Sequence, residues 1–281
     1  MKRILVCTDG SAYGQVCCQY AGWLSGRTGA AVEVLYVSDL RQFEVPLIAD
    51  LSGSLGIQPY QAILRQLQEL EEKKAAVVLE NASRTVSEAG AKGEVIGSHK
   101  TGLLVDCLTD HEAEADLVLL GKRGENANFA TEHLGSTMER VVRASTRPCL
   151  VTSRSFKPVS RLLVSYDGGA SCGKAIDFLA SSDAFKGLEI HVVTVAGAID
   201  ADTALHHLRD AETRLRAAGF QPVCQMLHGT AEDQIAAYVA GNAINLLVMG
   251  AYGHSRIRYL IIGSTTTEMI RTCKIPVLLF R

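Results

Sequence analysis

One short segment near the end of the chain concentrates glycines, hydroxyl side chains and basic side chains. The segment "GAYGHSRIRYLIIGST" (250–265) directly follows the apolar run "NLLVM", which is typical of a buried strand. Glycine at a strand end allows positive φ and a close approach of backbone to a ligand. The final Gly-Ser-Thr opens a predicted helix, whose first turn offers unpaired N–H groups and the positive end of the helix dipole. Together these features suit the binding of a phosphate group.

Several patterns that resemble other chemistry do not hold up. "GGASCGKA" (168–175) is close to a P-loop but ends in Ala175, where a P-loop needs a hydroxyl for Mg²⁺. The chain has no H-E-x-x-H or C-x-x-C pattern, so we predict no metal site built by protein ligands. We also predict no catalytic residue. His206, His207 and the Glu/Lys run 71–74 lie on charged helical patterns and are predicted to be solvated surface.

The composition is that of a globular protein with ample material for a core. The chain has 281 residues, 47% hydrophobic and 21% charged, and a net charge of −2. This balance argues against nucleic-acid and membrane-surface binding, and no apolar run approaches a membrane span. The start "MKRILVCTDGS" reads as a strand and not a signal peptide, so a cytoplasmic location is expected. Most of the eight scattered cysteines are expected to be small buried hydrophobes, with a redox pair at Cys17 and Cys18 as the alternative.

The sequence is written twice. "KRILVCTDGSA" returns as "SRLLVSYDGGA", "ADLVLLGKRG" as "INLLVMGAYG", and "LGSTMERVVRASTRPCLVT" as "IGSTTTEMIRTCKIPVLLF", in the same order. We therefore predict two tandem domains, 1–153 and 160–281, joined by the polar segment "SRSFKPVS". The first domain carries an extra loop and a long amphipathic helix within residues 40–89, a length typical of a lid or an interface.

Each half alternates short apolar runs with helical patterns. Strands that are apolar almost throughout, separated by helices, indicate a mostly parallel sheet covered on both faces, which is a doubly wound α/β architecture. In such sheets ligands bind beyond the carboxyl ends of the strands, where the strand order reverses. The glycine segments of both halves fall at these strand ends.

The spacing G-x2-G-x9-G-[ST] is also the nucleotide-binding signature of the universal stress protein family, which "GAYGHSRIRYLIIGS" resembles at every fixed position. "ILVCTDGS" and "LLVSYDGG" resemble the opening strand of the family, "LYVSDL" its second strand, and "RPCLV" and "IPVLL" its fifth. The resemblance covers nearly all of both halves. It implies a tandem member with two Rossmann-like (adenine nucleotide alpha hydrolase-like) domains, each a five-stranded mostly parallel sheet flanked by helices.

The resemblance further implies a site for an adenine nucleotide in each half, with ATP as the ligand and Mg²⁺ as a compatible counter-ion. Adenine and ribose contacts then fall at the ends of the first two strands of each half: Thr8, Asp9 and Val37, and Tyr166, Asp167 and Val195. Phosphate contacts fall on the glycine loops and the starts of the last helices: Gly121, Gly124, Gly135, Ser136 and Thr137, and Gly250, Gly253, Gly263, Ser264 and Thr265. His254 and Arg256 are either partners of the γ-phosphate or plain surface residues.

The two halves do not match the signature equally. The first half has ten residues between Gly124 and Gly135, and it places Glu125 and Glu132 near the expected phosphate, where carboxylates repel it. Lys122 and the neighbouring Arg123 are expected to offset this repulsion in part. We therefore favour the second half as the intact site, although its Tyr166 is bulky for that position.

Two alternatives remain open from the sequence. Asp9 and Asp167 precede glycines, so they also fit turn formation or helix capping. The predicted function is regulation by nucleotide binding with at most slow ATP hydrolysis, and the competing hypothesis is a nucleotide-free interaction module. By the family's habit of pairing edge strands, "PCLVT" and "PVLLF" are expected to pair within the chain as an internal pseudo-dimer. A further homodimer is left open.

Overall fold

A computed structural model describes residues 1–39, 59–124, 136–197, 200–251 and 262–281. The strands of the first half are β1 (Arg3–Thr8), β2 (Ala31–Ser38), β3 (Val95–Thr101), β4 (Leu117–Gly121) and β5 (Cys149–Thr152). Those of the second half are β6 (Arg161–Ser165), β7 (Glu189–Ala196), β8 (Val223–His228), β9 (Leu246–Gly250) and β10 (Val277–Phe280). The helices are α1 (Ala12–Thr28), α3 (Pro59–Glu88), α4 (Leu104–Glu112), α5 (Ser136–Ala144), α6 (Ala170–Ser181), α7 (Ala201–Ala217), α8 (Ala231–Gly241) and α9 (Ser264–Thr272), with a short 3-10 turn at Asp183–Phe185.

All of these strands form one continuous sheet. Its order is β3-β2-β1-β4-β5-β10-β9-β6-β7-β8, so each half contributes five strands in the same order. Within each half the pairs are parallel, and the halves meet where β5 and β10 run antiparallel, with Leu150 opposite Leu278. The predicted internal pairing of the two last strands is therefore confirmed. The strand order reverses between β1 and β4, and again between β6 and β9. In open α/β sheets the crevice for a ligand lies at the carboxyl ends of the strands at such a point.

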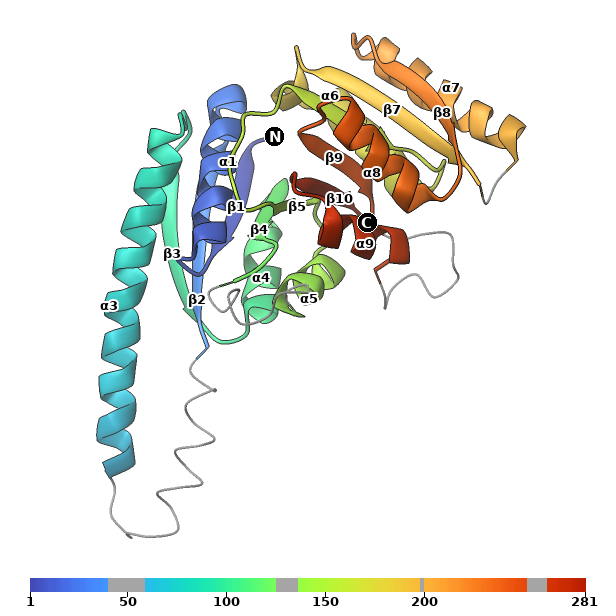
Figure 1. The fold of residues 1–281 in the computed structure, drawn as a ribbon. Helices are drawn as coiled ribbons and strands as arrows, with labels where there is room; N and C mark the ends of the chain where they lie inside the picture. The colour runs from blue at the N-terminus through green and yellow to red at the C-terminus, as the bar shows by residue number, and fades with distance from the viewer. Residues whose placement is uncertain (40–58, 125–135, 198–199, 252–261) are drawn as a thin grey trace.

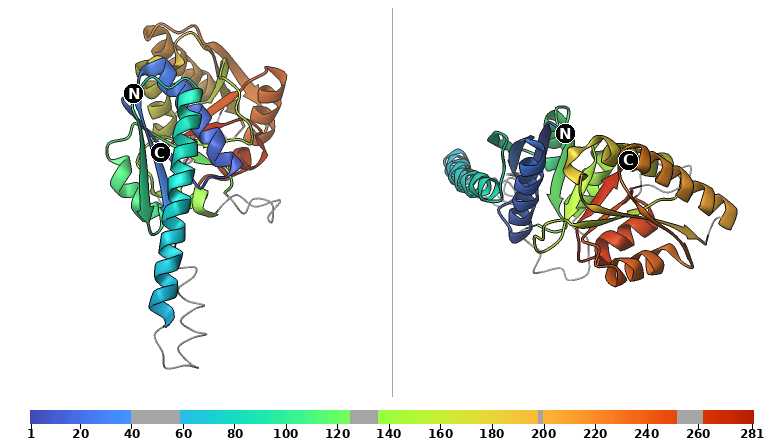
Figure 2. Two further views of the ribbon diagram at one scale, coloured as in Figure 1. Left: turned by 90° about the vertical axis from the view of Figure 1, so that its left-hand side faces the viewer. Right: turned by 90° about the horizontal axis from the view of Figure 1, so that it is seen from above.

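Helices cover both faces of the sheet, as the continuous apolar strands predicted (Figure 1). One core lies under α1, α3, α6 and α7, and the other lies under α4, α5, α8 and α9. The fold class is therefore the predicted doubly wound α/β architecture. Two views at right angles show that α3 extends well beyond the rest of the first half (Figures 1 and 2).

Helix α1 packs unusually close to α3 because glycine removes the side chain at the contact. A Cβ on Gly22 would lie 2.3 Å from the carbonyl oxygen of Val86 and 2.6 Å from the Cβ of Ala89. One turn later, a Cβ on Gly26 would lie 2.6 Å from the carbonyl oxygen of Gly90. The backbones therefore approach at two successive turns, and this contact fixes the direction in which α3 leaves the body.

The charged run on α3 is not simply solvated, and the prediction for residues 71–74 is wrong at Glu71. The Glu71 carboxylate accepts hydrogen bonds from the hydroxyls of Ser38 (3.1 Å) and Tyr36 (3.3 Å) at the end of β2. The Ser38 hydroxyl is also within 2.8 Å of His99 Nε2 on β3. Glu71 therefore ties the middle of α3 to the end of β2.

Basic side chains cross the seam between the halves in both directions. Lys122, just after β4, donates from Nζ to the carbonyls of Arg271 (2.8 Å) and Cys273 (3.2 Å) at the end of α9. Arg281, just after β10, donates to the carbonyl of Arg143 (3.2 Å) near the end of α5. Each cation lies at the negative end of a helix of the other half, which is a favourable placement. Lys122 therefore braces the seam, and burial lowers its pKa. Glu125 and Glu132, whose charge it was expected to offset, lie outside the described residues.

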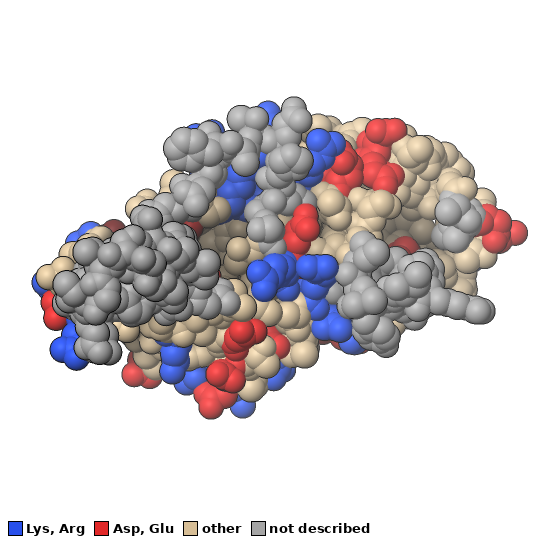
Figure 3. Space-filling view, turned by 90° about the horizontal axis from the view of Figure 1, so that it is seen from below, with Lys and Arg blue, Asp and Glu red and all other residues tan. Residues whose placement is uncertain are grey.

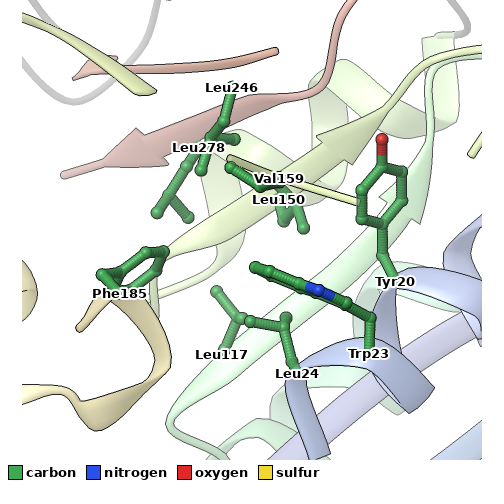
Figure 4. A pocket seen from close by; sticks show the side chains of 9 residues that line it. All are labelled: Tyr20, Trp23, Leu24, Leu117, Leu150, Val159, Phe185, Leu246 and Leu278. Atoms are coloured by element: carbon green, nitrogen blue, oxygen red, sulfur yellow. The ribbon is translucent and has the colours of Figure 1, made fainter. Parts of the chain in front are cut away.

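A small apolar cavity lies beside this seam (Figure 4). Its volume is about 10 Å³, which is at most the room of one water molecule. The lining comes from both halves: Tyr20, Trp23, Leu24, Leu117, Leu150, Val159, Phe185, Leu246 and Leu278. It is a packing void between the two domains and has no room for a nucleotide.

Six of the eight cysteines are buried, as predicted for most of them, whereas Cys107 and Cys224 are partly exposed. Cys17 and Cys18 are fully buried in α1, and burial raises both pKa values, that of Cys18 to about 12. Cys17 is hydrogen-bonded to the Thr152 hydroxyl at 3.0 Å. A thiol so far from ionisation does not react as a redox centre, so the alternative of a redox pair is not supported. Among the described residues, no helix is long and apolar enough to cross a membrane.

Equivalent brackets join the first and fourth strands of each half, with one chemical difference. Asp116, before β4, accepts hydrogen bonds from the backbone N–H groups of Lys2 and of Arg3, the latter at 3.1 Å. Asn245, before β9, accepts the same pair of bonds from Ser160 (3.1 Å) and Arg161 (3.0 Å). Burial acts to raise the pKa of Asp116, but the two N–H groups and the amino terminus outweigh it and hold the pKa below its usual 3.8.

This difference predicts acid sensitivity in the first half. We expect Asp116→Asn to fold normally and to lose less than about 1 kcal/mol at pH 7, because the bracket is partly exposed. A lowered folded-state pKa gives stability that is present above pH 3.8 and is lost as pH falls through that pKa. The deficit of the variant relative to wild type should therefore shrink between neutral pH and pH 3, as measured by urea denaturation. A deficit that stays constant over this range would contradict the assignment, and Asn245→Asp should show the opposite trend.

Candidate nucleotide-binding site

In the first half, the carboxylate at the end of β1 lies beside the glycine loop that follows β4. Asp9 Oδ1 accepts a hydrogen bond from the Ser11 N–H at 3.0 Å, so the predicted turn role is real. A Cβ on Gly124 would lie 2.8 Å from Asp9 Oδ2, so a larger residue there would push this carboxylate aside. The structure thus brings together Asp9 and Gly124, two residues predicted to share a site. The turn role of Asp9 does not exclude the site prediction, because a carboxylate can accept more than one hydrogen bond.

The second half repeats the turn. Asp167 Oδ1 accepts a hydrogen bond from the Gly169 N–H at 2.8 Å. Gly168 has φ of 77°, a left-handed conformation that favours glycine, and Gly10 has φ of 81° at the equivalent place. The two aspartates are therefore held in the same way at equivalent strand ends.

His207 corrects a sequence prediction. It was expected on a solvated face, but its ring packs on the turn, where a Cβ on Gly168 would lie 2.4 Å from the imidazole. The ring also meets Tyr166 edge to face, with centroids 6.4 Å apart. Its Nδ1 is buried and has no hydrogen-bond partner among the described residues. In the first half, Val78 of α3 covers Gly10 in the corresponding place.

The side chains at the ends of β1 and β6 turn toward the helices and away from the edge. The Thr8 hydroxyl accepts from the Gly10 N–H at 3.2 Å. The Tyr166 hydroxyl donates to Asp210 on α7 at 2.8 Å, and burial together with this bond raises the Tyr166 pKa to about 12. Both side chains are buried, and the Tyr166 ring is directed to α7. Val37 and Val195, predicted at the second strands, lie partly buried near the ends of β2 and β7.

The glycines that end β4 and β9 have a structural role of their own. A Cβ on Gly121 would lie 2.8 Å from the Cβ of Tyr13, and a Cβ on Gly250 would lie 3.1 Å from the Cβ of Ser171. Tyr13 and Ser171 begin the helices after the first strands of their halves. Packing alone therefore explains Gly121 and Gly250, whether or not a ligand binds there.

The start of α9 has the features of an anion site. Gly263 precedes the helix with φ of −57° and has no side chain to cap it, so the first-turn N–H groups receive no cap from this residue. The Gly263 N–H itself donates to the Ala251 carbonyl at 3.1 Å, which closes the loop at its base. Ser264 is exposed at the first helical position. The dipole and the N–H groups at this end favour a phosphate.

One hydroxyl of this cradle is already engaged. Thr265 donates from Oγ1 to Glu232 Oε1 at 2.6 Å, and Glu232 lies in the first turn of α8. Sequence patterns do not single out Glu232, because an acidic residue in a first helical turn is usually a favourable partner of the dipole of its own helix. Only the packing of α8 against α9 reveals that it also lies at the start of α9.

The remaining predicted residues divide into two groups. Ser136 and Thr137 begin α5, the helix equivalent to α9, and Thr137 is exposed. The others lie outside the described residues: Gly135, Gly253, His254 and Arg256, together with Glu125 and Glu132.

Seen from below, the side on which β1 and β2 end, Lys and Arg gather near the centre of the face among a few acidic side chains (Figure 3). Positive charge at this edge suits an anionic ligand.

Comparison with known proteins agrees with the duplicated architecture. The family model described as "Universal stress protein family" matches residues 1–153 and again 158–281. A universal stress protein of Synechocystis is 45% identical over 288 residues, which cover 100% of both chains. A universal stress protein of Mycobacterium tuberculosis is 23% identical over 74% of this chain and 73% of its own. The crystal structure of a universal stress protein from Archaeoglobus fulgidus has the same fold, with a TM-score of 0.72 at 24% identity over 99% of this chain and 96% of its own. The chain therefore belongs to the universal stress protein family and carries its domain twice.

Proposed function

We propose that this protein binds an adenine nucleotide, with ATP as the first candidate, at the carboxyl edge of at least one half of its sheet. The supporting observation is the convergence of three elements at that edge. They are the aspartate turn after the first strand, the backbone that directly follows the fourth strand, and the first turn of the last helix. A Mg²⁺ ion would accompany the phosphates as a counter-ion, and its ligands would come largely from the nucleotide and water.

The aspartates suit the ribose end of such a ligand. A carboxylate held by a turn N–H still has lone pairs that accept from a ribose hydroxyl, and the neighbouring backbone is placed to read the adenine edge. The α9 cradle suits the phosphate end. These complementary chemistries lie at one edge of one sheet, which is the arrangement that nucleotide sites of open α/β sheets use.

The role that follows is regulation by nucleotide occupancy. Fast phosphoryl transfer needs a residue that positions the attacking water and cations that neutralise the developing charge. The sequence predicts no such set, so we propose ATP hydrolysis that is slow at most.

The experiment is direct. Protein purified without added nucleotide is heated, and the released compounds are separated on an anion-exchange column. Titration calorimetry with ATP and MgCl₂ follows on nucleotide-stripped protein. We expect a released adenine compound or a calorimetric Kd in the micromolar range, which corresponds to about −8 kcal/mol. The absence of both, together with no thermal shift on adding ATP, would leave the proposal without support.

One observation favours the competing function, a nucleotide-free interaction module. Leu70 and Val77 lie seven residues apart on the projecting helix α3, with 61% and 57% of their surfaces exposed. Two large apolar side chains on one side of a helix are a common feature of protein contacts. If nucleotide binding is absent, this surface of α3 is the first place to seek a function.

A further inference from the structure

The two halves carry different residues at one equivalent position beside the phosphate cradle. Gly102 follows β3 with φ of 143°, and Gly229 follows β8 with φ of 132°. Helices α4 and α8 then begin two residues later, at Leu104 and Ala231. The second residue of the helix is Val105 in the first half and Glu232 in the second. Val105 is apolar and packs against the core, whereas Glu232 carries a negative charge.

The Glu232 carboxylate lies where it acts on the start of α9. Its Oε1 accepts the Thr265 hydroxyl at 2.6 Å, and Thr265 is the second residue of α9. The Glu232 charge therefore lies beside the first turn of α9, the helix whose N–H groups and dipole are proposed to hold a phosphate. A carboxylate at the start of a helix interacts favourably with the positive end of the helix dipole, as a phosphate would, and so reduces what a phosphate can gain there.

This contact works against a highly charged ligand. Two like charges a few ångströms apart in a partly buried site repel each other more strongly than in bulk water, and the repulsion grows with each added phosphate charge. Thr265 is also held as a donor to Glu232, so its hydroxyl is not available to a phosphate without breaking that bond. The adenine and ribose end of the site, at Asp167, is unaffected by either consequence.

We infer that Glu232 determines which ligand charge the second half accepts, and that this half selects adenosine or adenosine monophosphate over the triphosphate. The inference rests on the proposed nucleotide site, and it restricts the ligands expected in the second half to those with little or no phosphate charge. It makes the two halves chemically distinct sites on one chain. It also changes the expectation from the sequence, in which the intact glycine motif alone favoured the second half for ATP.

The test compares ligands of increasing charge on matched variants. Calorimetry is run with adenosine, AMP and ATP, at fixed ionic strength, on wild type, Glu232→Gln and Glu232→Val. The Gln variant keeps an acceptor for Thr265 and loses only the charge, whereas the Val variant copies the first half. We expect both variants to bind ATP at least about tenfold more tightly, which is about 1.4 kcal/mol, and to bind adenosine within about twofold of wild type.

Two controls assign the effect to this site. Asp233→Asn removes one charge from the same helical turn, but Asp233 faces Thr230, whose hydroxyl donates to it. This variant should leave the ratio of ATP to adenosine affinity unchanged. Adding a bulky residue at Gly263 to Glu232→Gln should cancel the gain in ATP affinity, which places the gain in the second half.

The possible outcomes separate this inference from the proposed function. If adenosine binds but Glu232→Gln leaves the affinity ratio unchanged, the inference is overturned and the nucleotide site stands. The inference is also overturned if Asp233→Asn gives an equal gain, because the effect is then one of net charge. If no variant binds any of the three ligands, the proposed function fails and the inference falls with it.

Discussion

Replacing Gly263 by tryptophan is expected to abolish nucleotide binding in the second half of the protein. Gly263 lies at the start of α9 with φ of −57°, a backbone conformation that any residue adopts, so the substitution adds bulk without backbone strain. The indole would fill the space over the first-turn N–H groups that is proposed for the phosphates. We expect at least about 100-fold weaker binding at this site, or about 2.7 kcal/mol, measured by titration calorimetry. If the chain binds two nucleotides, the stoichiometry should fall to one.

The matched control for this substitution is Gly241→Trp. Gly241 ends α8, and no atom lies within 4 Å of the position that its Cβ would take. The same added bulk at this open position should leave binding unchanged. Equal binding by wild type and Gly263→Trp would show that the nucleotide, if it binds at all, is held elsewhere, and any phosphate release that survived would come from another site or a contaminant.

Replacing Gly22 by alanine is expected to destabilise the first half severely. The added Cβ would lie 2.3 Å from the Val86 carbonyl oxygen, and a backbone atom within a helix cannot move aside as the end of a flexible side chain can. Helices α1 and α3 must therefore separate, which costs roughly 3 kcal/mol or more as overpacking of a tight contact. Urea denaturation at neutral pH measures the loss. Because α3 is held at this contact, limited proteolysis should also cut α3 sooner.

Replacing Gly173 by alanine, in the equivalent helix of the second half, is expected to raise stability. Gly173 lies inside α6, which corresponds to α1, and the nearest atom to its added Cβ is an Arg214 guanidinium nitrogen at 3.8 Å. Here alanine brings its better helix propensity without a clash, so stability should rise by up to about 1 kcal/mol. If both alanine variants raised stability, helix propensity and not packing would control the two sites.

The fold was largely predictable from the sequence because its cues are local or repeated. Apolar runs such as "RILVCT" and "NLLVMG" identify buried strands by themselves, and their return in the same order identifies two domains. The pairing of β5 with β10 was expected from the resemblance to the family, whose domains pair through edge strands, and the structure confirms it. These predictions needed no knowledge of which distant side chains meet.

The site was predictable only in outline, and the errors share one cause. The roles of Glu71, Lys122 and His207 depend on which segment lies opposite, and each meets a residue 33 or more positions away along the chain. A charge pattern on one helix cannot reveal such a partner. Glu232 was missed for the same reason, since its contact with Thr265 depends on the packing of α8 against α9. The aspartate turns, by contrast, involve residues two apart, and both were identified.

The antiparallel junction of β5 and β10 has a consequence for how the protein behaves in the cell. Two partners on one polypeptide face each other at an effective concentration far above that of separate subunits, so dilution does not part them. The two halves are always present in a ratio of one to one. At this junction, a half pairs with the other half of its own chain and not with a copy of itself. The two halves can therefore diverge in sequence without losing their pairing. They already differ at two equivalent positions, Val105 against Glu232 and Asp116 against Asn245. Such a fused pair behaves as an obligate heterodimer whose two members come from a single translation event.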